Sequence, residues 1–241
     1  MSARHRSTYA FGDTRGVLSS DHPEFIEVGL DSLNRNRRAL IKYIERDPWF
    51  RHSLEPVPCR GGPEVAARMA EAAEACGVGP MAAVAGVLAD LAREAMVDAG
   101  ASHAVVENGG EASVHGSGAV YVGFRAGDRW PSGRLGFQIT KAPIGVATSS
   151  AWYSHAFSFG EADSVTVFAD SAGLADAAAT AVCNMVSGGG GEVVRSAIRQ
   201  GLGISGVQGV LVLYEGLHGV GGVVPEFVMV EGPGESEGVL R

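Results

Sequence analysis

The sequence has few of the features that mark secreted, membrane-spanning or nucleic-acid-binding proteins. Its 241 residues include three cysteines and no Cys-x-x-Cys pair, a pattern that excludes a disulfide framework and a zinc signature and is typical of reduced cytoplasmic thiols. No run reaches 18 consecutive apolar residues, so we expect neither a membrane span nor a membrane partner. A net charge of −8 argues against a nucleic-acid partner. The N-terminal segment lacks the apolar run of a signal peptide, so we expect a cytoplasmic protein.

Three common site motifs are also missing. No G-x-G-x-x-G follows a predicted strand and opens a predicted helix, and no G-x-x-x-x-G-K-[ST] is present, so neither a Rossmann cofactor site nor a P-loop is supported. No G-x-S-x-G elbow is present, which argues against a serine hydrolase. A chain of this length can nevertheless bury a core without disulfides or a metal.

The order of the predicted elements indicates an α+β fold with antiparallel sheets, because helices and strands come in groups and do not alternate regularly. We predict helices over residues 31–46, 49–53, 63–76, 80–98 and 192–200, and an alanine-rich helix that ends near residue 184. Asp47 is predicted to cap the helix over 49–53, and Gly77 to end the helix over 63–76 in the left-handed conformation. Strands are predicted over 24–30, 103–107, 112–115, 119–125, 134–139, 164–169, 207–214 and 226–230. Residues 1–20 are predicted to form an irregular arm with a short strand over 9–11, residues 145–150 a loop, and residues 233–241 a flexible tail.

A carboxylate and a hydroxyl lie four residues apart in the alanine-rich segment. Residues i and i+4 stack on one face of a helix, so Asp176 and Thr180 could converge on one point. Hard oxygen ligands of this kind suit Mg²⁺, which fills its remaining positions with water and substrate phosphate. The alternative is that Thr180 bonds back to a backbone carbonyl while Asp176 lies on a solvated face.

A second polar group lies at a predicted hairpin tip. The pair Asn108-Gly109 is a strong turn signal, and Gly110 follows it. Two acids, Glu107 and Glu111, flank the turn. They could line a ligand site, or the turn and its solvated acids could have no function beyond reversing the chain.

Hydroxyls and one histidine form a third group. Thr148, Ser149 and Ser150 supply hydroxyl and backbone N–H groups in a predicted loop, which could hold a phosphate, although such residues are common in ordinary loops. His155 could donate to a phosphate or act as a general base near neutral pH. A lone histidine is more often structural.

Four segments, taken in order, resemble the ApbE superfamily of Mg²⁺-dependent flavin transferases. They are GPMAAVAGVLAD at 79–90, VENGGE at 106–111, GVATSS at 145–150 and ADSVTVFADSAGLADAAATAV at 162–182. More closely, they are similar to an uncharacterised cytoplasmic branch of that superfamily. The resemblance implies a T-fold-type structure in which residues 1–232 form one domain of two α+β units, with antiparallel sheets and paired helices packed on one side.

The resemblance also implies a ligand site. In the transferases FAD and Mg²⁺ bind together, and FMN is moved to a Thr or Ser of an acceptor protein. By this resemblance Mg²⁺ is held by Asp176, Thr180 and a backbone carbonyl near residues 83–85, and His155 is the candidate catalytic residue. The pocket for FAD, FMN or another phosphorylated ligand would be lined by Glu107, Asn108, Gly109, Gly110, Glu111, Thr148, Ser149 and Ser150.

Three departures from the family pattern weaken the expectation of FMN transfer more than the expectation of ligand binding. The family's lysine before the helix glycine is Ala85 here, the acid of the hairpin tip is Glu111 where the family has Asp, and the loop after His155 is short. Two alternatives therefore stay open. One is a T-fold protein that binds a pterin-like heterocycle through Glu107 or Glu111. The other is a non-catalytic module of the same fold, and a homo-oligomer is compatible with each hypothesis.

Overall fold

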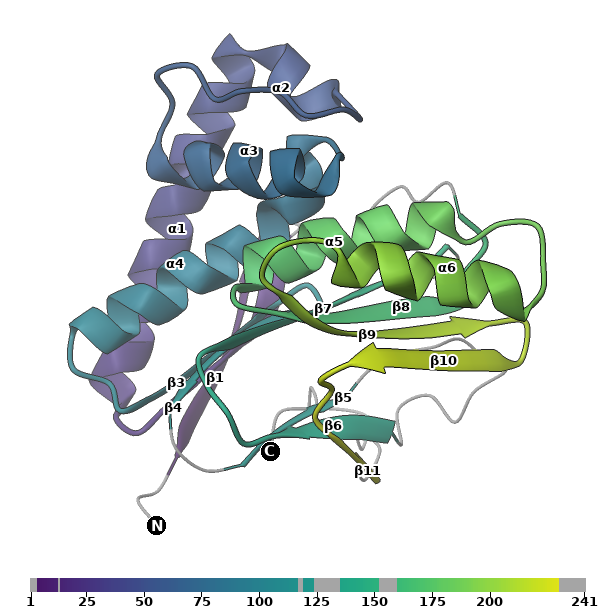
Figure 1. Ribbon diagram of the computed structural model, residues 1–241. Helices are drawn as coiled ribbons and strands as arrows, with labels where there is room; N and C mark the ends of the chain where they lie inside the picture. Colours follow the sequence, from purple (N-terminus) through teal and green to yellow (C-terminus); the bar gives the residue numbers. More distant parts are fainter. Residues whose placement is uncertain (1–3, 13, 117–118, 124–134, 152–159, 230–241) are drawn as a thin grey trace.

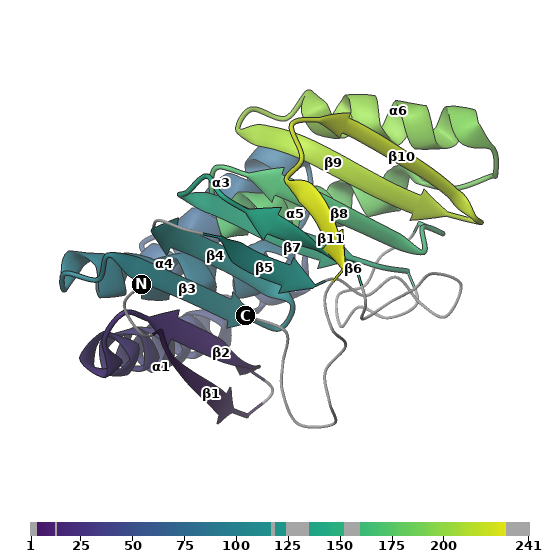
Figure 2. The same ribbon diagram turned by 90° about the horizontal axis from the view of Figure 1, so that it is seen from below.

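A large antiparallel sheet forms the centre of the protein. The computed structural model describes residues 4–12, 14–116, 119–123, 135–151 and 160–229. Helices cover one face of the eight-stranded sheet, and a three-stranded sheet lies on the other side (Figures 1 and 2). The large sheet contains, in spatial order, β1 (His5–Phe11), β2 (Thr14–Ser20), β3 (His103–Asn108), β4 (Glu111–Gly116), β7 (Ile144–Ser149), β8 (Ser164–Ala169), β9 (Val207–Tyr214) and β10 (Leu217–Gly222). The small sheet contains β11 (Glu226–Met229), β6 (Leu135–Ile139) and β5 (Val120–Gly123).

The large sheet is built from the same order of elements twice, namely two strands, helices and two further strands. Between β2 and β3 lie α1 (Pro23–Arg46), α2 (Pro48–His52), α3 (Glu64–Cys76), the 3₁₀ helix η1 (Pro80–Ala83) and α4 (Val84–Asp98). Between β8 and β9 lie α5 (Ala172–Met185) and α6 (Gly191–Leu202). The predicted α+β fold, with antiparallel sheets and helices on one side, is confirmed.

The N-terminal quarter differs most from the prediction. The predicted strand over 24–30 is wrong, because α1 begins at Pro23, with Glu24 in its first turn. Its buried positions Ile26, Gly29 and Leu33 continue the helical period back through that segment. The predicted strand over 9–11 lies within β1, but the rest of the irregular arm is wrong, because β1 and β2 pair as an antiparallel hairpin with Gly12 at φ 62° between them.

Two glycine-rich stretches that were not predicted as strands are strands. Residues 145–149 belong to β7, and β10 was missed because its sequence, LHGVGG, has few residues typical of strands. In β10 the glycines make room for α6. A Cβ atom on Gly219 would lie 2.6 Å from Val194 Cγ1, and one on Gly221 would lie 2.4 Å from Ile198 Cγ2.

The ends of the short helices follow their local sequence. Asp47 caps α2 as predicted, because its side chain accepts a hydrogen bond from the Phe50 backbone N–H. Gly77 ends α3 in the left-handed conformation, with φ 68°, also as predicted. The helix predicted over 80–98 is divided into η1 and α4.

Two apolar layers hold the sheets and helices together. The larger one joins the helices to one face of the eight-stranded sheet and includes Leu18, Met96 and Val167. The second fills the space between the two sheets, where the ring of Phe137 meets that of Phe168 edge to face, with centroids 4.8 Å apart. Within the described residues, no single helix is long and apolar enough to cross a membrane, and α3 with η1–α4 passes that test only as a pair bent by 104°.

Three glycines let α5 approach closely to α4 and β7. A Cβ atom on Gly86 of α4 would lie 2.1 Å from the Ala172 carbonyl oxygen, and one on Gly145 of β7 would lie 2.1 Å from the Ala172 nitrogen. A Cβ atom on Gly173 would lie 2.4 Å from Val87 Cγ2. Backbone contact of this kind fixes the start of α5 against both neighbours, and with it the level of Asp176 and Thr180.

Candidate functional site

The candidate site lies where the β3–β4 hairpin, the beginning of α4 and the middle of α5 meet. The hairpin turns through Gly109 and Gly110, whose φ angles are 71° and 116°, while Asn108 pairs with Glu111 as the last position of the ladder. The turn therefore lies one residue later than predicted. A φ of 116° lies outside the left-handed region that Asn and Asp tolerate, so the position of Gly110 needs glycine.

Asn108 ties the hairpin to α4 and to the N-terminal hairpin. Its Nδ2 donates to the Ala85 carbonyl oxygen at 2.9 Å, and its Oδ1 accepts from the Tyr9 hydroxyl at 2.9 Å. Tyr9 is buried, and burial together with the charges of Glu107 and Glu111 raises the pKa of its hydroxyl, so the hydroxyl remains a donor. The Ala85 carbonyl lies within the region that the resemblance implies as a metal ligand, and Asn108 fixes its position.

Asp176 faces this assembly from α5. Its Oδ2 accepts a hydrogen bond from the Gly86 backbone N–H at 3.0 Å, and the carboxyl is partly buried. Burial raises the pKa of Asp176 to about 7, the charge of Asp90 adds to the rise, and the Gly86 and Ala85 N–H groups oppose it. The alternative of an Asp176 on a solvated face is therefore wrong.

A second carboxyl shares this environment. Burial raises the pKa of Glu111 well above its ordinary value, and the charge of Asp176 is the next cause. A Cβ atom on Gly109 would lie 3.4 Å from Glu111 Oε2, which places that oxygen beside the hairpin tip. Two carboxyl groups thus lie in one poorly solvated place, where each disfavours ionisation of the other. A bound cation would favour both ionised forms.

Thr180 lies one turn after Asp176 on the same face of α5 and is 6% exposed. Its hydroxyl has no hydrogen-bond partner among the described residues. From the contact between Gly145 and the start of α5, strand β7 and helix α5 run in the same direction. Four residues along the strand cover about the same length as eight residues along the helix. Ser149 of β7 therefore lies near the level of Thr180.

The predicted phosphate cradle at 148–150 is not a loop, because Thr148 and Ser149 end strand β7. Successive strand residues point to opposite faces. Ser149 shares the helix-covered face with Ala147, while Thr148 shares the other face with Val146 and pairs with Thr166, Oγ1 to Oγ1, at 2.9 Å. Ser149 Oγ is buried without a partner in the described part of the chain, and Ser150 is also buried. The hydroxyls of Thr148 and Ser149 therefore do not converge on one ligand.

Glu107 has a different role from Glu111. Its neighbours in β3, Val106 and Asn108, point to the helix-covered face of the sheet. The Glu107 side chain therefore leaves the strand on the opposite face. Its Oε1 accepts from the Gly110 backbone N–H at 2.7 Å and braces the hairpin tip. Burial raises the pKa of this carboxyl. His155 lies outside the described residues, so its catalytic role stays a prediction.

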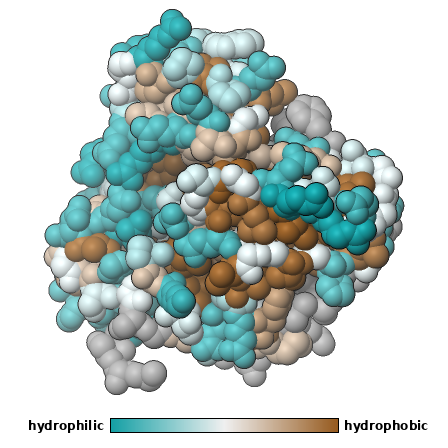
Figure 3. Space-filling model, viewed as in Figure 1, coloured by the Kyte–Doolittle hydropathy of each residue, from teal (hydrophilic) through white to brown (hydrophobic). Residues whose placement is uncertain are grey.

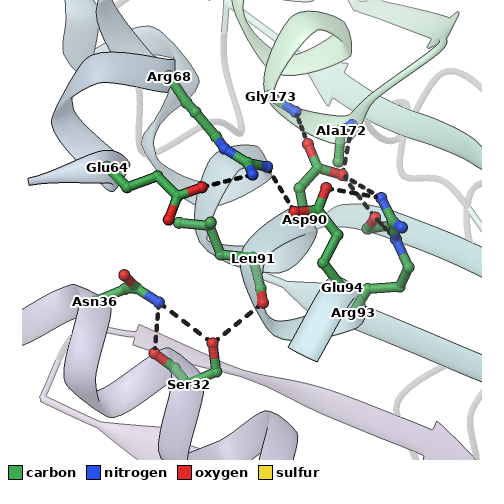
Figure 4. A network of polar contacts seen from close by, with 11 residues as sticks. Ser32, Asn36, Glu64, Arg68, Asp90, Leu91, Arg93, Glu94, Ala172 and Gly173 are labelled. Atoms are coloured by element: carbon green, nitrogen blue, oxygen red, sulfur yellow. Dashed lines mark hydrogen bonds and ion pairs between the residues drawn. The ribbon is translucent and has the colours of Figure 1, made fainter. Parts of the chain in front are cut away.

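Asp90 was not singled out from the sequence, although it organises the start of α5. One carboxylate oxygen accepts from the Ala172 N–H at 3.0 Å and from the Ser113 hydroxyl at 2.6 Å, and the other accepts from the Gly173 N–H at 2.9 Å. Figure 4 shows the carboxylate pointing from α4 at these two N–H groups. The available signal was one acid in the apolar run VAGVLADLA of a buried helix.

Asp90 belongs to a chain of ion pairs. Arg93 lies 3.8 Å from Asp90 and 3.3 Å from Glu94, and Glu94 pairs with Arg68 of α3 at 2.7 Å. These contacts, also drawn in Figure 4, connect α3 and α4 to the capped end of α5. The N–H groups of Ala172 and Gly173 at the start of α5 are thereby satisfied within the protein, whereas Asp176 and Thr180 lie further along that helix.

The donor set fits a hard cation in its chemistry. Among the described residues, no group of three or more His, Cys, Asp or Glu side chains is arranged to hold a metal ion. The candidate ligands here are instead two carboxyl groups and one hydroxyl, from Asp176, Glu111 and Thr180. Mg²⁺ is commonly coordinated by such oxygens together with water and ligand phosphate.

Solved structures define the class of fold. The apo flavinyl transferase ApbE of Pseudomonas stutzeri matches with a TM-score of 0.58 and 13% identity, over 91% of this chain and 94% of that chain. The ApbE protein of Thermotoga maritima also matches with a TM-score of 0.58, at 18% identity over 91% and 97% of the two chains. The protein therefore has the ApbE fold, as the sequence resemblance implied.

The family follows from sequence. The family model described as AbpE bacteria matches residues 12–210, and the chain belongs to that family. A protein of Methanosarcina acetivorans named UPF0280 protein is 40% identical over 222 residues, which cover 91% of this chain and 87% of that protein. A UPF0280 protein of Archaeoglobus fulgidus is 35% identical over 229 residues, or 94% and 95% of the two chains.

Proposed function

We propose that this protein binds a flavin or another phosphorylated dinucleotide together with Mg²⁺, and that Asp176 and Thr180 hold the metal. The observation that carries the proposal is geometric: the Asp176 carboxyl accepts from the Gly86 N–H at 3.0 Å, one helical turn before Thr180 on α5. Burial and the charge of Asp176 also raise the pKa of Glu111 at the neighbouring hairpin. Mg²⁺ would favour the ionised carboxylates and would in turn bind the ligand's phosphates. The ApbE protein of Pseudomonas stutzeri, which has the same fold, is a flavinyl transferase, and this supports a flavin as the ligand.

FMN transfer is the finer form of the proposal. In such a transfer the pyrophosphate bond of FAD breaks, FMN joins a Thr or Ser hydroxyl of an acceptor, AMP leaves, and the hydroxyl proton passes to a base. The hairpin tip and Ser149 would contact the ligand, and His155 is the candidate base. AMP release from FAD in the presence of Mg²⁺, lost in His155→Ala, would support this form.

The binding proposal is tested by thermal unfolding with FAD, FMN and a pterin, each with Mg²⁺ or with a chelator. We expect a flavin with Mg²⁺ to raise the melting temperature by about 5 °C or more at saturating concentration. Asp176→Asn keeps an acceptor for the Gly86 N–H, but the part of the rise in melting temperature that depends on Mg²⁺ should be lost. Asp98→Asn, at an exposed position near the end of α4, should behave as the wild type.

Two results would contradict the proposal. In one, no compound stabilises the wild type more with Mg²⁺ than with chelator. In the other, Asp176→Asn responds as fully as Asp98→Asn. Stabilisation by the pterin alone, without a metal requirement, would favour the heterocycle-binding alternative through Glu111.

A further inference from the structure

The end of the molecule that carries α2 has a charge opposite to that of the rest. Residues 35–60 contain seven Arg and Lys and three Asp and Glu, a local charge of +4 in a chain of −8, so the remainder carries −12. The net charge of the whole chain therefore conceals a cationic region. This region, which we call the basic corner, comprises the second half of α1, α2 and the segment that follows to Arg60.

Cations follow one face of α1 into the basic corner. Arg35, Arg38, Lys42 and Arg46 are spaced by three or four residues and are all exposed, so they form one stripe. Arg51 of α2 is also exposed. None of these five side chains forms an ion pair with a described residue, in contrast to the paired arginines of α3, α4 and α6. Their charge is available to a partner.

Two large apolar side chains project beside these cations. Trp49 is 67% exposed and Leu54 is 61% exposed. Figure 1 shows α2 at the outer end of the helical layer, away from the sheets, and Figure 3 shows a largely hydrophilic surface at that end. Trp49 and Leu54 are therefore exposed apolar side chains within the same short segment as the cations of α1 and α2.

The projection is rigidly supported. Phe50, next to Trp49, is fully buried, and its ring meets that of Tyr43 edge to face with centroids 5.1 Å apart. On the other side, the Ser53 hydroxyl donates to the Glu55 carbonyl at 2.8 Å and accepts from the Glu55 N–H at 3.2 Å, which fixes the turn that presents Leu54. Trp49 and Leu54 are thus held outward by ordered structure.

We propose that the basic corner docks on a lipid surface that carries anionic headgroups. A tryptophan and a leucine can enter the headgroup boundary while arginine and lysine side chains reach the phosphates around them. A second copy of the chain is a poorer occupant, because a symmetric contact would bring two regions of +4 together. A nucleic acid would use the cations but would leave Leu54 without a role.

Docking of this kind needs no membrane span. The expectation of no membrane partner depends on the absence of a long apolar run. That absence argues against a membrane-spanning helix but not against docking on a membrane surface. The basic corner is also joined to the candidate site, because a Cβ atom on Gly79 would lie 2.0 Å from the Ser53 carbonyl oxygen, and η1 leads from Gly79 to Ala85. Docking would therefore place the α4 side of the site near the headgroups. The proposal does not depend on the identity of the ligand.

The test is co-sedimentation of the full chain with vesicles of phosphatidylcholine alone and with vesicles in which about a third of the lipid is phosphatidylglycerol. We expect binding to the anionic vesicles only, weakened by salt. Arg38→Gln/Lys42→Gln/Arg46→Gln should weaken it about 100-fold, at about 1 kcal/mol for each cation. The double variant Trp49→Ser/Leu54→Ser should show no detectable binding to the anionic vesicles. The control Val223→Ser/Met229→Ser removes two apolar side chains that are 69% and 71% exposed elsewhere and should bind as the wild type.

Three results with vesicles would overturn the proposal. They are equal sedimentation with both kinds of vesicle, unchanged binding of Trp49→Ser/Leu54→Ser, and loss of binding in the Val223/Met229 control. Retention of the protein by RNA as tightly as by anionic vesicles, with Trp49 and Leu54 dispensable for both, would identify a general polyanion site in place of a lipid-docking one. Circular dichroism of each variant checks that the fold is intact.

Discussion

Asp90→Ala is expected to lower the free energy of unfolding by about 3–5 kcal/mol, because it removes a buried charge whose partners stay buried. The N–H groups of Ala172 and Gly173 and the hydroxyl of Ser113 would lose their acceptor. Arg93, whose side chain is 13% exposed, would lose one of its two carboxylate neighbours. Chemical denaturation followed by circular dichroism measures the effect.

The matched control is Glu94→Ala on the same helix. Glu94 pairs with Arg68 and Arg93 but is 33% exposed, so its loss should cost about 1 kcal/mol or less. A cost for Asp90→Ala no larger than that for Glu94→Ala would show that the α4–α5 junction does not depend on this carboxylate. Asp90→Asn should fall between the two, since an amide has one oxygen for the N–H groups of α5.

Acid is expected to stabilise the metal-free protein through Asp176. Its pKa is about 7 in the native state and lower in the unfolded chain, so the native state binds more protons between about pH 4 and pH 7. The free energy of unfolding contributed by this group therefore falls as the pH rises through that window. At pH 8 Asp176→Asn should be more stable than the wild type by on the order of 2–4 kcal/mol, and the difference should vanish near pH 4.

The neighbours of Asp176 make the comparison with a variant necessary. Glu111 and Asp90 are the acids that interact with it, and the thiol of Cys76, whose pKa is raised to about 12 by burial and by Asp176, stays protonated throughout. Because Asp176→Asn also lowers the pKa of Glu111, the pH dependence of the two carboxyls should decrease together. Asp98→Asn should keep the wild-type pH profile. A wild-type profile in Asp176→Asn would contradict the proposed burial of this charge.

Local patterns predicted much of the fold and part of the site. Caps and turns depend on a few adjacent residues, so Asp47, Gly77 and the glycines of the β3–β4 tip were read correctly or within one residue. The local pattern does not predict strands β10 and β7, because Gly219, Gly221 and Gly145 make room for helices that are distant in sequence. Tertiary contact, which a local pattern does not contain, decided those segments.

The same limit applies to the site. The helical period placed Asp176 and Thr180 on one face, as found. Pairing of Asp176 with Glu111, and the cap that Asp90 gives α5, join residues 65 and 82 positions apart in the chain. The hydroxyls at 148–150 were assigned to one ligand on the assumption of a loop, and the alternation of β7 places Thr148 and Ser149 on opposite faces.

Calorimetric titration of Mg²⁺ with FAD at pH 6 and pH 8 tests the central claim, that Asp176 is a metal-binding carboxylate, most directly. Metal binding needs the ionised group, so we expect uptake to release about one proton at pH 6 and about a tenth of a proton at pH 8, with weaker binding at pH 6. Asp176→Asn should abolish both the binding and the proton release. Mg²⁺ binding of equal affinity at the two pH values, or unchanged in Asp176→Asn, would contradict the account.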